Sequence, residues 1–117
     1  MNQHEKLNYV EFGASDLEAT KAFFLAVFDW EFTDYGPEYS SFSNQGLDGG
    51  FFQSELCGTP KTGGALLVFY SDNLKATMEK IERFGGLITQ PIFEFPGGRR
   101  FHFTEPSGNE FAVWSPA

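Results

Sequence analysis

The residues best suited to chemistry in this 117-residue sequence are a glutamate and a histidine, each set within an otherwise apolar, β-prone run. Glu11 follows Tyr9 by two positions, and His102 follows Arg100 by two positions. Side chains two apart share one face of a strand. A carboxylate on an apolar face is costly unless it is paired or its pKa rises. Glu11 and His102 are therefore candidate catalytic residues for acid–base chemistry, or ligand anchors.

The alternative for Glu11 is structural. An ion pair with Arg100 or His102 would compensate its charge without any ligand. A lone histidine in such a strand is more often one whose hydrogen bonds are satisfied within the barrel than a catalyst. Arg100 is either a solvated residue or a bidentate partner for an anionic ligand group.

The apolar patterning predicts two successive β-α-β-β-β repeats. Leu17, Ala19 and Thr20 recur 57 positions later as Leu74, Ala76 and Thr77. A capping box from Ser15 to Glu18 is expected to start the first helix, and Gly85-Gly86 to end the second. The predicted strands cover residues 7–14, 30–35, 39–43, 50–55, 64–71, 87–95, 99–104 and 110–114.

Strand alternation also predicts which side chains line a cavity. Val10 and Phe12, with their counterparts Leu67 and Phe69, should face the helices. The opposite faces should form an aromatic, largely apolar cup of the kind that binds small molecules. The expected ligand-binding residues are Tyr9, Phe51, Gln53, Leu66, Val68, Tyr70, Arg100, Ala112 and Trp114.

Composition excludes several classes of function. A net charge of −8 argues against nucleic acid and anionic lipid as partners. The single cysteine rules out an internal disulfide and a cysteine-rich zinc site. The longest apolar run, residues 65–70, is too short to span a bilayer, and the polar N-terminus carries no signal-peptide core. We expect a soluble, cytoplasmic protein.

Several short motifs resemble one known family. They are the opening run from Tyr9 to Glu18, the segment 27–30 at the end of the first predicted helix, Gly85-Gly86, and the turn 105–109 before the last strand. Their order and spacing resemble the vicinal oxygen chelate superfamily, which includes glyoxalases, bleomycin resistance proteins and extradiol dioxygenases. The resemblance implies an α+β fold of two tandem βαβββ modules, at about residues 6–56 and 63–115. These would form one glyoxalase-like domain over residues 1–117, with a curled mixed sheet around a cavity. It also implies a homodimer.

Many members of this family bind a divalent metal, and the resemblance places the four ligand positions at Tyr9, Leu66, Ala112 and either Gln53 or Glu55. Leucine and alanine cannot coordinate a metal, and too few donors are left for a zinc or magnesium site. No cofactor is therefore expected. The alternative is a relocated divalent-metal site built from Glu11, His102 and Glu55.

The sequence thus predicts a protein that binds a small, partly apolar molecule in a barrel cavity without the family metal site. Two other functions stay open. One is a metal-dependent lyase, isomerase or dioxygenase with relocated ligands, and the other is a partner-binding module with no ligand. Whether the protein is an enzyme is left undecided.

Overall fold

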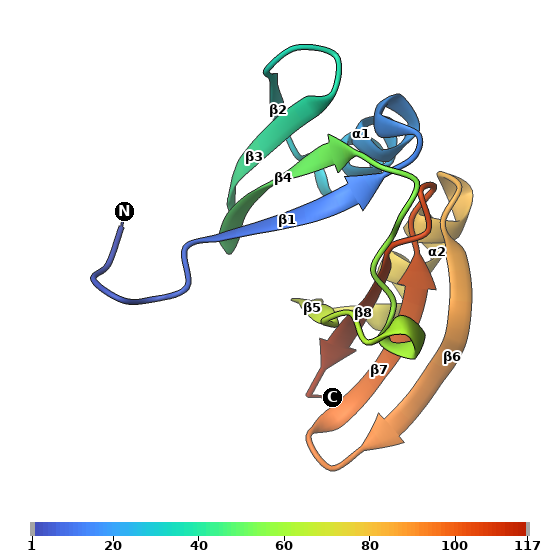
Figure 1. Cartoon of the computed structure of the whole chain (residues 1–117). Helices are drawn as coiled ribbons and strands as arrows, with labels where there is room; N and C mark the ends of the chain where they lie inside the picture. Colours follow the sequence, from blue (N-terminus) through green and yellow to red (C-terminus); the bar gives the residue numbers. More distant parts are fainter. Residues whose placement is uncertain (1, 117) are drawn as a thin grey trace.

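Two four-stranded mixed sheets and two helices make up the fold in a computed structural model that describes residues 2–116. The first sheet has the order β1-β4-β3-β2 and the second the order β5-β8-β7-β6, so the second half repeats the first (Figure 1). This confirms the α+β class and the two βαβββ modules. The strands are β1 (Tyr9–Ala14), β2 (Phe32–Asp34), β3 (Tyr39–Gln45), β4 (Leu47–Gln53), β5 (Leu67–Tyr70), β6 (Leu87–Phe95), β7 (Gly98–Thr104) and β8 (Glu110–Ser115).

Each helix follows the first strand of its module: α1 spans Leu17–Phe28 and α2 spans Leu74–Arg83. The N-cap of α1 is Asp16, whose carboxylate accepts a hydrogen bond from the Ala19 amide, rather than Ser15 as the capping box predicts. The N-cap of α2 is Asn73, in the equivalent position. None of the helices in residues 2–116 is both long and apolar enough to cross a membrane.

Strand β4 begins earlier than its sequence predicts. Residues Asn44 and Gly46 both have positive φ angles, which reverse the chain tightly enough for Gln45 to pair with Leu47. The strand therefore runs from Leu47 to Gln53 instead of from residue 50 to 55. Strand β5 is shorter than predicted, since it covers Leu67–Tyr70 instead of residues 64–71, and a 3₁₀ turn, η1 (Pro60–Thr62), lies in the connection before it.

The core joins the two modules through their helix-facing surfaces. The Phe24 ring on α1 lies 4.5 Å from Trp30, 5.5 Å from Phe51 and 5.7 Å from Phe111. Phe12 stacks on Phe51 of its own sheet and also contacts Phe111 of the other sheet, at 5.2 Å in each case. The high aromatic content is therefore used largely within this shared core.

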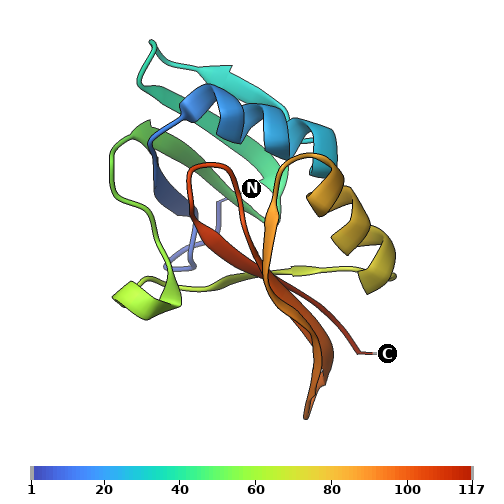
Figure 2. The ribbon, with the colours of Figure 1, turned by 90° about the vertical axis from the view of Figure 1, so that its right-hand side faces the viewer.

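The two sheets do not close around one cavity within the chain. Because their helix-facing surfaces share a core, their opposite surfaces point away from that core and from each other. Figure 2 shows α1 lying along the first sheet with α2 beside it. We call the two surfaces opposite the helices the first and second outer faces. The sheets are therefore not closed within the described chain.

A buried polar cluster braces the modules. Asn109, in the turn before β8, donates from Nδ2 to the Gly13 carbonyl oxygen at 2.8 Å and to Glu105 Oε2 at 2.7 Å. Its Oδ1 accepts from the Gly58 amide at 2.7 Å. Thr20 on α1 donates to Glu105 Oε1 at 2.6 Å. The turn at 105–109 thus fixes β8 against α1, β1 and the connection between β4 and β5.

Candidate functional site

Glu11 lies on the first outer face within a chain of hydroxyl groups. The Tyr39 hydroxyl donates to Glu11 Oε2 at 2.9 Å, and the Tyr9 hydroxyl is hydrogen-bonded to Tyr39. Since the Tyr39 proton goes to Glu11, the Tyr9 hydroxyl must donate to Tyr39. Burial raises the pKa of Tyr39 above its ordinary value, and its hydrogen bonds to Tyr9 and Glu11 raise that pKa further.

A glycine makes room for this arrangement. Gly50 pairs with Glu11 across β1 and β4, and a Cβ atom at Gly50 would lie 2.2 Å from the Tyr39 hydroxyl oxygen. The Tyr39 ring can therefore lie across the sheet and bring its hydroxyl to Glu11. The carboxylate accepts from one neutral donor, Tyr39, and in the described chain it forms no ion pair with Arg100 or His102. The expected structural ion pair is not formed.

Phe51 and Gln53 do not lie on the first outer face. Phe51 is fully buried on the helix side, because it pairs with Phe12 in the parallel register of β1 and β4. Gln53 lies on that same side, since it pairs with Ala14, and it donates to the Ser15 carbonyl oxygen. Phe52 takes the outer position instead. The alternation predicted from the sequence is therefore wrong by one residue in this strand.

The second outer face carries most of the other predicted residues. One row across the sheet consists of Val68, Ala112, His102 and Gln90. The next row consists of Tyr70, Trp114, Arg100 and Phe93. The Tyr70 and Trp114 rings meet edge to face at 5.6 Å. Leu66 precedes β5 and is half-buried. Val68, Tyr70, Arg100, Ala112 and Trp114 therefore share one sheet face, and their role in ligand binding stays a prediction.

His102 is 4% exposed and lies beside an acidic neighbour. Its Nδ1 lies 3.0 Å from Glu110 Oε2. Because a carboxylate only accepts, Nδ1 carries the proton in this hydrogen bond. His102 Nε2 is buried and has no hydrogen-bond partner in the described part of the chain. Glu110 therefore orients His102, and the other ring nitrogen has no hydrogen-bond partner within residues 2–116.

Arg100, two residues before His102, is held by aromatic rings. Its guanidinium carbon lies 5.4 Å from the ring centroid of Phe93 and 5.4 Å from that of Phe95. Within residues 2–116 no carboxylate forms an ion pair with Arg100, and its buried Nε has no hydrogen-bond partner. A cation without a counter-ion, in a chain of net charge −8, is suited to an anionic ligand group.

The residues at the family's metal positions do not fit a metal ion. Leu66 and Ala112 offer no donor atoms, and the Tyr9 hydroxyl is already bonded to Tyr39. In the described residues, no three His, Cys, Asp or Glu side chains gather closely enough to hold a metal, and this includes the relocated set of Glu11, His102 and Glu55. The donor atoms at these positions are thus too few for the metal that many members of the family bind.

The predicted site omitted three residues that contact its members on these faces: Tyr39, Glu110 and Phe93. Glu110 shares its strand face with Ala112, so alternation alone could have added it. Tyr39 could be found only with the pairing of β3 and β4, which brings it over Gly50. Phe93 required the irregular register between β6 and β7.

Two modules of strand order 1-4-3-2, with inter-module packing through the helices, define a paired βαβββ fold, and known proteins share it. The sequence profile of the Glyoxalase/Bleomycin resistance protein/Dioxygenase superfamily matches residues 6–113. The chain belongs to this superfamily. No curated protein matches the sequence significantly.

Solved structures show the same fold at low sequence identity. A glyoxalase/bleomycin resistance protein/dioxygenase family enzyme from Burkholderia phytofirmans PsJN has a TM-score of 0.80 at 18% identity, covering 96% of this chain and 99% of that one. The fosfomycin resistance protein FosX from Listeria monocytogenes gives 0.78 at 19%, covering 97% and 94%. Lactoylglutathione lyase from Agrobacterium tumefaciens gives 0.70 at 19%, covering 97% and 96%. At these identities the likeness concerns the fold.

Proposed function

We propose that this protein binds a small, partly apolar molecule bearing an anionic group, without the family metal. The observation that carries the proposal is Arg100, whose charge has no carboxylate partner on the second outer face of the described chain. Trp114 and Tyr70 on the same face offer apolar contact surface beside it. A few polar groups among aromatic side chains are typical of small-molecule sites.

The polar groups of this face have complementary roles. The guanidinium of Arg100 presents a planar fork that matches a carboxylate or phosphonate, and its stacking on Phe93 and Phe95 keeps it in place. His102, in the neighbouring row, is held by Glu110, and its Nε2 is buried without a hydrogen-bond partner in the described chain. This arrangement favours a molecule that carries an anionic group on an apolar body.

A second copy of the chain supports the site. A ligand held on one outer face would stay open to solvent, since the two outer faces of one chain point apart. We propose that a homodimer brings the second outer face of one copy opposite the first outer face of the other. The cavity would then combine Arg100 and His102 with Glu11, Tyr9 and Tyr39.

Matched ligands test the proposal. A panel of small carboxylic acids with aromatic or branched bodies, each paired with its neutral amide, is screened by thermal shift and followed by calorimetry. We expect acids to raise Tm more than their amides. Arg100→Met should abolish this preference, whereas Arg83→Met, which removes an exposed charge on α2, should leave it intact.

Two outcomes contradict the proposal. One is a panel in which no acid binds more tightly than its amide. The other is an acid preference that survives Arg100→Met, because the anion would then be bound elsewhere.

A further inference from the structure

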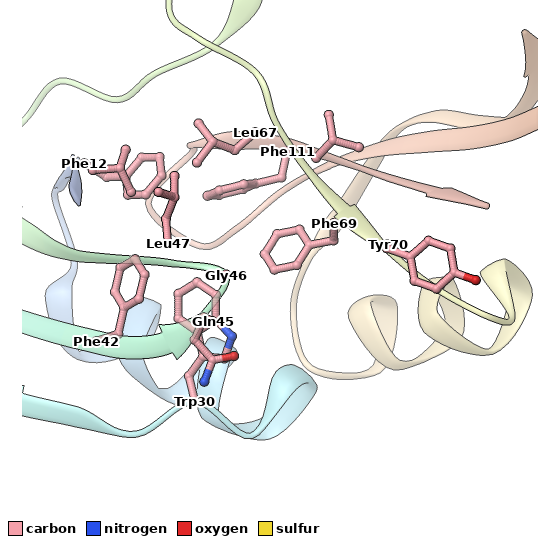
Figure 3. A pocket seen from close by; sticks show the side chains of 12 residues that line it. Phe12, Trp30, Phe42, Gln45, Gly46, Leu47, Leu67, Phe69, Tyr70 and Phe111 are labelled. Atoms are coloured by element: carbon pink, nitrogen blue, oxygen red, sulfur yellow. The ribbon is translucent and has the colours of Figure 1, made fainter. Parts of the chain in front are cut away.

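A second hollow lies on the helix side of the sheets, between the two modules (Figure 3). Its volume is about 550 Å³. Phe12, Trp30 and Phe42 contribute to it from the first module, and Leu67, Phe69 and Phe111 from the second. We call it the inter-module pocket. Most of its lining comes from the helix-facing sheet surfaces, while Val68 and Tyr70 reach it from β5 and also belong to the second outer face.

The chemistry of the lining excludes charged ligands. No lining side chain is charged, in a chain of net charge −8. The few polar groups are neutral, and one of them, the Tyr70 hydroxyl, already donates to Asp72 at 2.8 Å. A charged group buried here would lose its hydration without finding a partner. A mostly apolar ligand would lose little.

The walls of the pocket are already in place. Trp30 and Phe42 stack at 4.3 Å, and Phe69 stacks on Phe28 at 4.4 Å, so these rings are fixed by the core. Rings held in this way present faces and edges to an aromatic guest without a cost in side-chain ordering. The volume lies within the range of small-molecule sites, which runs from roughly 300 to 1,000 Å³.

We propose that the inter-module pocket binds an uncharged, predominantly apolar aromatic molecule. Both modules of a single chain supply the walls, so this site needs no second copy. Neither Arg100 nor His102 is part of its lining, although Tyr70 borders both this pocket and the anion-binding face proposed above.

A neutral dye tests the pocket. N-phenyl-1-naphthylamine is titrated into the protein carrying Trp114→Phe, so that Trp30 is the only remaining tryptophan of the two in the sequence. We expect saturable binding of one dye per chain, with quenching of Trp30 by energy transfer. The sulfonated analogue 8-anilino-1-naphthalenesulfonate should bind at least about tenfold more weakly, because its charge would be desolvated.

Variants at the rim locate the bound dye. Leu47→Arg places a charge at the pocket, and Leu47→Trp fills it with an apolar ring. Both should weaken dye binding by about tenfold or more. Leu87→Arg is the matched control, since Leu87 is 65% exposed and is not part of the lining. It should leave the affinity unchanged.

Three outcomes would overturn the proposal. Complete absence of dye binding would do so. Dye binding that is weakened equally by the Leu47 variants and by Leu87→Arg would also do so. The third is a wild-type dimer that binds no dye but becomes a dye-binding monomer in Leu47→Arg, because a second copy would then occupy the pocket. Light scattering on the same samples identifies the third outcome, because it measures the change from dimer to monomer. A pair of variants at Leu47, one charged and one apolar, guards against a simple folding defect.

Discussion

Glu11 is held by hydroxyl groups rather than by a cation, and this changes what its replacement should do. Tyr39 donates to one carboxylate oxygen, and Tyr9 extends the chain of hydrogen bonds. In the described chain, Arg100 and His102 have other neighbours, namely Phe93, Phe95 and Glu110. The catalytic roles of Glu11 and His102 stay predictions.

Glu11→Gln should therefore leave the free energy of unfolding within about 0.5 kcal/mol of wild type. The amide oxygen of glutamine can still accept from Tyr39, and no buried cation loses its partner. Denaturant melts measure this directly. A loss of about 1–4 kcal/mol would instead indicate a hidden ion pair.

Tyr39 should make the stability depend on pH in alkaline solution. Its pKa in the folded chain is raised above the ordinary 10.0 by burial and by its two hydrogen bonds. The folded state thus favours the protonated form, so this contribution is complete below pH 10 and is lost as the pH rises through the folded pKa. The urea midpoint of wild type should fall more steeply above pH 10 than that of Tyr39→Phe. Parallel curves would show that the hydroxyl is not perturbed.

At the scale of elements, the turn before β8 does more than reverse the chain. It carries Asn109 and Glu105, which connect β8 to β1, to α1 and to the connection between β4 and β5. Both side chains are buried, so each hydrogen bond protects a polar atom from being left without a partner.

Asn109→Ala should lower the free energy of unfolding by about 1–3 kcal/mol, since it leaves the Gly13 carbonyl, the Gly58 amide and Glu105 short of partners. Urea unfolding at neutral pH measures the loss. Asn8→Ala, an exposed asparagine, is the control and should change stability by less than about 0.5 kcal/mol. Equal effects of the two variants would show that the hydrogen bonds of Asn109 do not stabilise the packing of the two modules.

At the scale of the molecule, apolar side chains stay uncovered on both outer faces. Phe52 is 40% exposed on the first, while Val68 and Tyr70 are 45% and 58% exposed on the second. Strands β1 and β5, each at a sheet edge, also present unpaired backbone groups. A single chain leaves these surfaces in water, which favours association.

We predict a homodimer at micromolar concentration, detected by light scattering. Phe52→Asp, which places a charge on the first outer face, should shift the population towards monomer. Leu25→Asp, at an exposed leucine on α1, is the control and should not. If wild type is a monomer at this concentration, the dimer prediction is wrong, and so is the proposal that a second copy closes the cavity.

Local sequence patterns were sufficient to predict the two βαβββ modules, the helix-facing pattern of β1 and β5, and most of the second outer face. These features depend on periodicity, which repeats within each strand and helix. Three features emerged only from the folded chain: Phe51 is buried, Tyr39 holds Glu11, and Glu11 lies apart from Arg100 and His102. Each of these depends on register or on the packing of one module against the other, and pairing between distant residues leaves no periodic trace in the chain. The early turn before β4 sets the register in which Phe51 points to the helices, because alternate residues of a strand point to opposite sides of a sheet.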